Sequence, residues 1–220
     1  MSEPLPQTED EINRRHNEKK AKQHAARAKI LATKTEERGL LIVHTGTGKG
    51  KSTAAFGMAL RAWNQGFDLA VFQFVKSAKW KVGEEAAFRE LGRLHDEHGV
   101  GGPVEWHKMG SGWSWSRRHG TEVDHAGAAA DGWAEIARRL AEQRHDFYVL
   151  DEFTYPLKWG WVDIEEVVKV LTSRPGTQHV VITGRDAPQQ LLDVADLVTD
   201  MTKVKHPMDI GRKGQKGIEW

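Results

Sequence analysis

LLIVHTGTGKGKST, residues 40–53, is the stretch that decides the fold of this 220-residue chain. It opens with an apolar run, residues 40–44, that is typical of a buried strand, and a helix-like segment continues through Trp63. Between the two lies a loop rich in glycine that ends in Gly-Lys-Ser. A strand, a glycine-rich loop and a helix in this order predict a site where backbone N–H groups bind phosphate.

The loop is one residue shorter than the usual G-x-x-x-x-G-K-[ST] pattern, because only three residues separate Gly46 from Gly50. The shorter loop can still bind an anion, because glycines let successive N–H groups turn inward and the helix adds its positive amino end. Lys51 neutralises phosphate charge, and Ser52 is expected to ligate Mg²⁺ or Mn²⁺. A purely structural glycine turn is the alternative. The predicted nucleotide-binding residues are Gly46, Thr47, Gly48, Lys49, Gly50, Lys51, Ser52 and Thr53.

Two acids end the apolar run at residues 146–152, which is predicted to be a strand. Asp151 and Glu152 therefore stand where a parallel strand meets a bound nucleotide, facing the metal ion or its waters. Acids at strand ends are common. Their value as evidence comes from the phosphate loop about a hundred residues upstream. We expect Ser52, Asp151 and Glu152 to hold the metal.

Strands and helices alternate along the rest of the chain. This alternation predicts an α/β fold with a mostly parallel sheet and helices on both faces, of the P-loop NTPase (RecA-like) class. A basic helical extension over residues 1–37 is expected to precede one α/β domain over residues 38–220. The other predicted strands are 68–75, 104–109 and 179–184, and the other predicted helices are 83–97, 124–144, 163–172 (with Asp163 as N-cap) and 188–194.

Composition limits the class of protein. There are 32 Lys and Arg against 31 Asp and Glu, so net charge supplies no argument for a nucleic-acid or membrane partner. No cysteine is present, which excludes disulfides, thiolate metal sites and a cysteine nucleophile. No apolar run approaches the roughly 20 residues that span a bilayer. We expect a cytoplasmic protein that binds neither nucleic acid nor membrane.

The extension carries eight Lys and Arg and one acid between Asn13 and Lys34. Such a run is typical of a solvated basic helix. A mobile tail, a segment that binds an anion, and a segment that packs over a site are the alternatives.

Tryptophan is unusually frequent, with nine residues against two tyrosines. Trp106, Trp113 and Trp115 lie within ten residues, the last two on a loop of glycine and serine. Two indoles at positions i and i+2 of such a loop suit a wide, flat, apolar ligand. The alternative is that one or two of them pack in the core.

From about Arg38 to Trp220, in order, the chain resembles the P-loop type ATP:corrinoid adenosyltransferases. The motifs that carry the resemblance are TGTGKGKSTAAFG, VFQFVK, GSGWSW, VLDEFTYPLKWGW, RPGTQHVVITGR, LLDVADLVTDM and VKHPMDIGRKGQKGIEW. The family shares the shortened loop and has a counterpart of the basic amino-terminal helix. Ser52 stands where the family usually has Thr, and Trp113 where it usually has Phe.

The resemblance implies that Co(I) of a reduced corrinoid attacks the 5′-carbon of ATP and that the whole triphosphate leaves. Lys51 would then be the countercharge, and Glu152 would belong to the catalytic acidic pair. Arg61 would reach the nucleotide. Trp113 and Trp115 would lie under the corrin ring and displace its lower axial ligand, because an indole offers cobalt no lone pair.

The resemblance also implies partners: a reductase such as a flavoprotein, and a second copy of the chain in a homodimer. Two other functions compete with it. A RecA-like ATP hydrolase or kinase would use Glu152 to position water or an acceptor hydroxyl. A module that binds nucleic acid or senses ATP through the basic extension is disfavoured by the near-neutral net charge.

Overall fold

The computed structural model describes residues 8–75, 83–109 and 122–218. Contacts between Cα atoms divide the chain into two compact units, Met1–Glu37 and Arg38–Trp220. The first unit contains one helix, α1 (Glu9–Ala32), and the second contains all the strands.

A single parallel sheet organises the second unit, with strand order β3-β2-β4-β5-β1-β6. Three of its four central strands are buried at every residue, as expected of strands covered on both faces. The strands are β1 (Leu41–Thr45), β2 (Leu69–Gln73), β3 (Val104–Lys108), β4 (Phe147–Asp151), β5 (His179–Thr183) and β6 (Leu197–Asp200). The helices are α2 (Lys51–Asn64), α3 (Gly83–His98), α4 (Glu122–Ala141), α5 (Thr154–Lys158), α6 (Ile164–Ser173), α7 (Gln189–Val194) and the 3₁₀ turn η1 (Pro207–Ile210).

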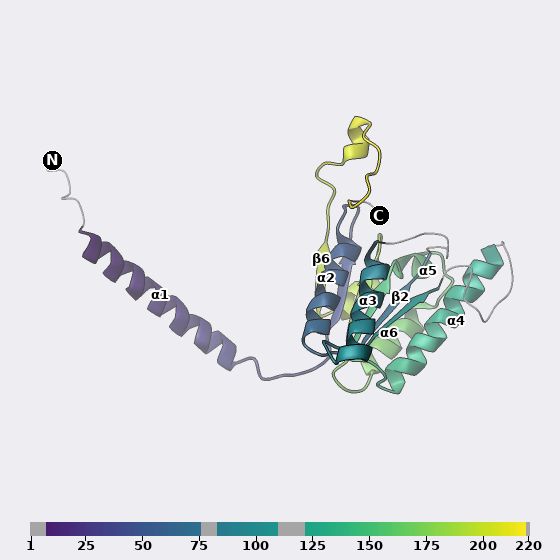
Figure 1. The fold of residues 1–220 in the computed structure, drawn as a ribbon, viewed down its shortest axis with the longest axis horizontal. Coiled ribbons are helices and arrows are strands. Elements are labelled where there is room, and N and C mark those ends of the chain that lie inside the picture. The colour runs from purple at the N-terminus through teal and green to yellow at the C-terminus, as the bar shows by residue number, and fades with distance from the viewer. Residues whose placement is uncertain (1–7, 76–82, 110–121, 219–220) are drawn as a thin grey trace. The chain divides into compact units, whose positions relative to one another are not determined.

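Two hydrophobic clusters cover the two faces of this sheet. Helices α2, α3, α4 and α6, which contribute to them, are labelled in Figure 1. On β4, Phe147 and Val149 join α2 and α3 in one cluster, whereas Tyr148 and Leu150 join α4 and α6 in the other. The alternation follows from the two-residue period of a strand. The predicted α/β class, with a parallel sheet and helices on both faces, is confirmed.

Most predicted elements form within a few residues of their expected bounds. Asp163 is the N-cap of α6, where its side chain accepts a hydrogen bond from Glu165 N at 2.9 Å. Three elements were not predicted, α5, β6 and the 3₁₀ turn η1. The α5 helix has only five residues and contains Pro156. All four residues of β6 are exposed. Because neither face of this strand is buried, its sequence lacks the alternation of apolar and polar residues by which a strand is recognised.

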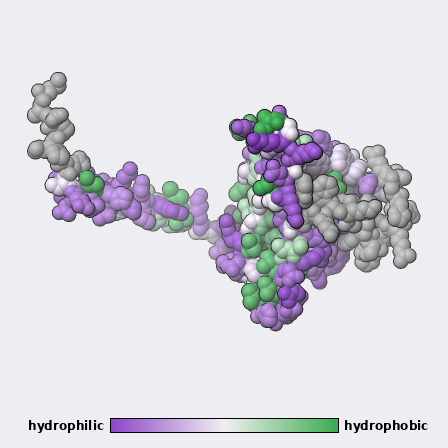
Figure 2. All heavy atoms as spheres, turned by 45° about the horizontal axis from the view of Figure 1, so that its top comes forward, coloured by the Kyte–Doolittle hydropathy of each residue, from purple (hydrophilic) through white to green (hydrophobic). Residues whose placement is uncertain are grey.

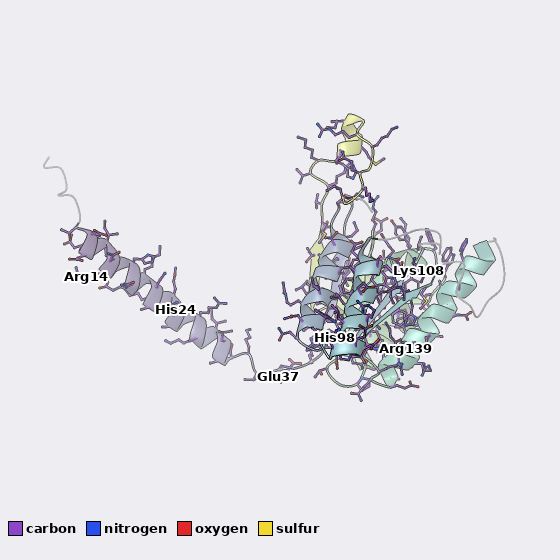
Figure 3. All side chains as sticks on the ribbon, in the orientation of Figure 1. Arg14, His24, Glu37, His98, Lys108 and Arg139 are labelled. Carbon is purple, nitrogen blue, oxygen red and sulfur yellow. The ribbon has the colours of Figure 1, made fainter. Side chains whose placement is uncertain are left out.

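The α1 helix has a capping box, in which Thr8 Oγ1 accepts from Glu11 N and the Glu11 carboxylate accepts from Thr8 N. It buries no residue, and its surface is hydrophilic almost throughout (Figure 2). Arg14 and His24 project away from its axis (Figure 3). The predicted basic helix is present, and its own residues create no apolar face to pack.

Membrane insertion finds no support in the described helices, since none of them combines the length and apolar character that a bilayer span requires.

Candidate active site

Backbone strain gathers at the carboxyl edge of the sheet. Of the four described non-glycine residues with positive φ, three follow strands there: Val75 after β2 (φ 65°), Glu152 after β4 (60°) and Asp186 after β5 (53°). A residue held in this region costs of the order of 1–3 kcal/mol and persists where the surrounding structure fixes it, typically at functional sites. The phosphate loop follows β1 at the same edge.

Lys51 closes the phosphate loop on itself. Its ammonium donates to the carbonyl oxygens of Gly46 at 2.9 Å and Gly48 at 2.6 Å, and only 8% of the residue is exposed. Gly46 (φ 95°) and Gly50 (φ 108°) adopt left-handed conformations that a side chain would disfavour. The loop therefore curls around the ammonium at the amino end of α2, where its charge and the helix end act together on an anion.

The end of β6 packs directly against this loop. Gly48 N donates to Met201 O at 2.5 Å, Met201 N donates to Thr45 O at 2.9 Å, and Lys203 N donates to Thr47 Oγ1 at 3.4 Å. The fit leaves no room for side chains. A Cβ on Gly46 would lie 2.3 Å from Asp200 Oδ1, and one on Gly48 would lie 2.5 Å from Met201 O.

Asp151 is completely buried at the end of β4, between the neighbouring strands. Its Oδ2 accepts from Gln73 Nε2 at 2.9 Å and its Oδ1 accepts from Thr183 Oγ1 at 2.8 Å. The carboxylate is thus oriented from both sides. Gln73 was missed in the sequence, although a glutamine inside the apolar run VFQFV is a signal that could have identified it.

Glu152 is held beside Asp151 by the same threonine, because Glu152 N donates to Thr183 Oγ1 at 3.0 Å. Just beyond, Thr154 donates to the carbonyl of Arg185 at 2.8 Å, which brings the turn after β5 to the start of α5. Arg185 was not predicted as a site residue. Its charge acts to lower the pKa of both Lys51 and Tyr155, so it lies near the edge that carries the loop.

Charges of both signs act on Lys51, and their net effect together with burial is to lower its pKa. Burial is the largest cause that lowers the pKa of its ammonium, and the charges of Arg185 and Lys49 act in the same direction. Glu152 and Asp200 oppose them and favour the charged form. Two acids and two further cations therefore surround the ammonium before any ligand binds.

The structure brings together most of the predicted site residues but not all. Arg61 lies in the last turn of α2, ten residues or about 15 Å along the axis from Lys51, and is exposed. It does not contribute to the phosphate loop, and its contact with the nucleotide stays a prediction. Trp113 and Trp115 lie outside the described residues. Trp106 is a core residue, 6% exposed and packed against Phe56 and Phe88.

The donor set is compatible with Mg²⁺. The half-buried Ser52 in the first turn of α2, together with Asp151 and Glu152, offers only hard oxygen ligands. Among the residues described, no three His, Cys, Asp or Glu side chains cluster to hold a metal by themselves. An ion here would take most ligands from phosphate and water, which is the usual arrangement for Mg²⁺.

Comparisons with known proteins agree with this geometry. Residues 37–220 match the family described as "ATP:corrinoid adenosyltransferase BtuR/CobO/CobP". The chain is 41% identical over 207 residues to a corrinoid adenosyltransferase of Sinorhizobium sp (94% of this chain, 92% of the relative). It is 40% identical over 210 residues to one of Pseudomonas aeruginosa (96% and 98%), and 42% identical over 190 residues to one of Salmonella typhimurium (86% and 90%).

Proposed function

This chain belongs to the ATP:corrinoid adenosyltransferase family, and we propose from that premise that its phosphate loop holds the triphosphate of ATP while a corrinoid receives the 5′-deoxyadenosyl group. The product is an adenosylated corrinoid of the kind formed in adenosylcobalamin biosynthesis or salvage. The observation that carries the proposal is the Lys51 ammonium, held by Gly46 O and Gly48 O inside the loop. A loop built in this way binds a polyphosphate without touching the carbon that reacts.

The electron pair of Co(I) forms the new bond to C5′, and the C5′–O bond breaks as the triphosphate leaves intact. Charge then grows on the oxygen of the phosphate that departs. Lys51 and the amino end of α2 are placed to stabilise that charge. The loop also fixes the triphosphate, which limits the positions that C5′ can take relative to the cobalt.

Mg²⁺ is proposed as the counter-ion of ATP, bound through Ser52 and, directly or through water, through Asp151 and Glu152. Bound there, the ion would neutralise phosphate charge. The chain itself supplies the orientation: Gln73 and Thr183 fix the Asp151 carboxylate. Trp113 and Trp115 are proposed to close under the corrin ring, on the strength of the resemblance.

Partners and location are also proposals. Reduction of the cobalt requires an electron donor, for which a flavoprotein reductase is proposed, and a homodimer is proposed from the resemblance. The exposed Leu197 and Val198 on the edge strand β6 are apolar side chains that such an interface could bury. The cytoplasm, which supplies ATP and protein reductants, is the proposed location.

Product analysis tests the function. Incubation with ATP, Mg²⁺ and a chemically reduced corrinoid should release inorganic triphosphate in step with a light-sensitive Co–C corrinoid. The rival function, a RecA-like hydrolase or kinase, predicts ADP as the main product whether or not a corrinoid is present. That result would contradict the transferase.

A further inference from the structure

The C-terminal segment, residues 203–218, concentrates positive charge. It contains five Lys and Arg and one acid, Asp209. Lys203 donates to both carboxylate oxygens of Asp209 at 3.0 Å, so the charges of these two residues offset each other. The remaining cations are Lys205, Arg212, Lys213 and Lys216, and within the described part of the chain none of their side chains makes an ion pair or hydrogen bond.

Three arginines on the helices of the same unit behave differently. Arg93, Arg138 and Arg139 each pair with two carboxylates at 2.5 to 2.9 Å. Since the whole chain is close to neutral, the four cations of the C-terminal segment form a local excess of positive charge. An uncompensated group of this kind raises the local concentration of anions.

This excess begins at the phosphate loop. Lys203, the first residue of the segment, donates its N–H to Thr47 Oγ1, and Met201 just before it accepts from Gly48 N. From the end of β6 the segment rises beyond the sheet edge where α2 starts (Figure 1). The loop and the segment are therefore consecutive parts of one surface.

The loop alone is not strongly positive. Three acids, Asp151, Glu152 and Asp200, lie at the same edge of the sheet as the cations Lys49, Lys51 and Arg185. A triphosphate is a polyanion, and these groups leave its charge unbalanced. The C-terminal segment continues from the end of β6 beside the loop, and its cations would supply the missing charge.

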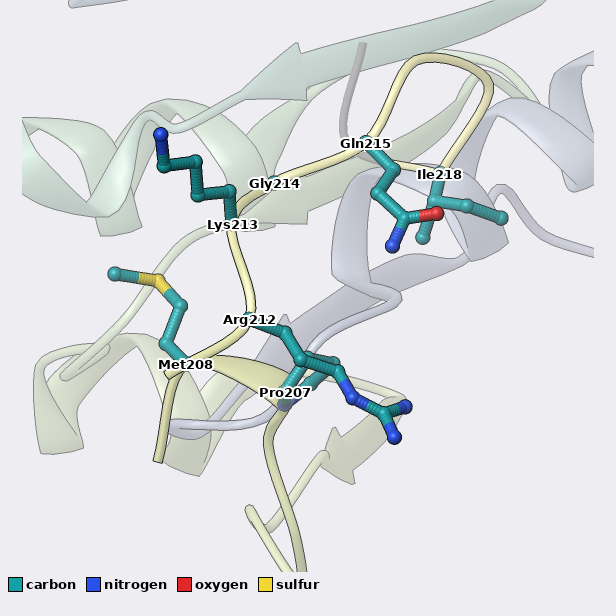
Figure 4. Close-up of a pocket in the computed structure, with 7 residues that line it drawn as sticks. All are labelled: Pro207, Met208, Arg212, Lys213, Gly214, Gln215 and Ile218. Atoms are coloured by element: carbon teal, nitrogen blue, oxygen red, sulfur yellow. The ribbon is translucent and has the colours of Figure 1, made fainter. Parts of the chain in front are cut away.

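The segment folds around a small pocket of about 130 Å³ (Figure 4). Arg212 and Gln215 project to one side of the backbone and Lys213 to the other. Pockets for drug-sized ligands measure roughly 300–1,000 Å³, so a corrin macrocycle does not fit, whereas a phosphoryl group does. The guanidinium and amide donors suit phosphate oxygens.

We propose that the C-terminal segment is the second half of the triphosphate site, with Arg212 as the residue that contacts a phosphoryl group and Lys213, on the other side of the backbone, as a further positive charge beside it. This inference rests on the proposed function, because only an adenosyl transfer of this kind leaves an intact triphosphate to be held. The segment neutralises the charge that the loop leaves unbalanced.

Titration of the full-length protein with inorganic triphosphate in a calorimeter, with Mg²⁺ and without corrinoid, tests the proposal. The double variant Arg212→Gln/Lys213→Gln should raise the Kd for triphosphate roughly tenfold or more, since charge-assisted contacts are lost. The matched control Arg93→Gln/Lys169→Gln removes the same charges from exposed positions on α3 and α6, and should change Kd less than twofold. The charge-conserving variant Arg212→Lys/Lys213→Arg should retain most of the affinity.

An unchanged Kd in the first variant, or equal losses in the variant and its control, overturns the proposal. So does a variant whose only defect is a raised KM for the corrinoid, because the segment would then bind that substrate. Circular dichroism and thermal unfolding confirm that each variant is folded. The wild-type product analysis separates the two hypotheses: ADP as product rejects the function, whereas triphosphate as product with an unchanged Kd rejects only the role of the segment.

Discussion

At the scale of single residues, the site depends on backbone atoms that lie so close together that no side chain would fit between them. Lys51 is held by the loop that it serves, and Gly46 and Gly48 face the backbone of the next strand at less than 3 Å from where a Cβ would lie. Glycine here permits close approach as well as positive φ. Two substitutions distinguish the effect of the Lys51 charge from the effect of the close packing at Gly48.

Lys51→Ala should lower kcat/KM for ATP at least tenfold, because a charge-assisted contact contributes roughly 1.5–3 kcal/mol. The residue is only 8% exposed and bonded to two loop carbonyls. A small fall in Tm is therefore also expected. Steady-state kinetics and thermal unfolding check both, with the exposed Lys169→Ala as control. Full activity in Lys51→Ala would place the nucleotide elsewhere.

Gly48→Ala should abolish tight ATP binding while the net charge stays the same. The added methyl group would lie 2.5 Å from Met201 O, and its entry forces the loop and the end of β6 apart. Gly57→Ala on α2 is the matched control, because nothing lies within 4 Å of its Cβ position. That change should leave ATP binding intact and stabilise the helix by roughly 0.5–1 kcal/mol. Calorimetric titration with ATP distinguishes the two, and equal affinities would refute the clash.

At the scale of elements, a polar network joins β3 to α4 at the end of the sheet opposite the phosphate loop. Glu105 accepts from Arg139 at 2.6 Å and from Arg144 at 3.0 Å, and contacts His107 Nε2 at 3.0 Å. Arg139 also lies 5.5 Å above the ring of Phe72. Figure 3 shows Arg139 near one end of α4 and Lys108 toward the other edge of the sheet. The network fixes the edge strand to the helix that covers it.

This network makes part of the stability sensitive to acid. Burial by itself raises the pKa of Glu105, but the hydrogen bonds from Arg139, Arg144 and His107 outweigh it and lower the pKa to about 2 from 4.5. A depressed folded-state pKa adds stability that is fully present above pH 4.5 and is lost as the pH falls toward 2.

Glu105→Gln should therefore destabilise the protein at pH 7, and the difference from wild type should shrink by pH 3.5. Denaturant unfolding at the two pH values measures it. Glu166→Gln, at an exposed position on α6, is the control and should show no such trend. A difference that stays constant with pH would mean that the effect of the variant is steric.

At the scale of the whole molecule, the two units contribute differently. The α1 helix buries none of its residues, whereas the second unit holds both hydrophobic clusters. Stability should thus reside in residues 38–220, and any role of the extension should be in function.

Removal of residues 1–37 should leave Tm within about 2 °C of the full-length value, since burial of apolar surface dominates stability. One alternative from the sequence is that the extension packs over the site, and on that alternative kcat/KM for the corrinoid should fall. Differential scanning calorimetry and kinetics on the two proteins check this. A large loss of Tm would show that the extension packs on the domain. Unaltered kinetics would exclude packing over the site.

The sequence alone determined the fold class, the phosphate loop, the acidic pair and the family. Each of these is identified by a short contiguous pattern, such as an apolar run, glycines at fixed spacing or acids at the end of a strand. Only the tertiary structure placed Asp200 and Met201 against Gly46 and Gly48, and Gln73 against Asp151. These pairs are separated by about 80 to 150 residues, and they meet because of the strand order β3-β2-β4-β5-β1-β6. No local pattern encodes strand order, since hydrophobic periodicity reports which face of a strand is buried and not which strand lies beside it.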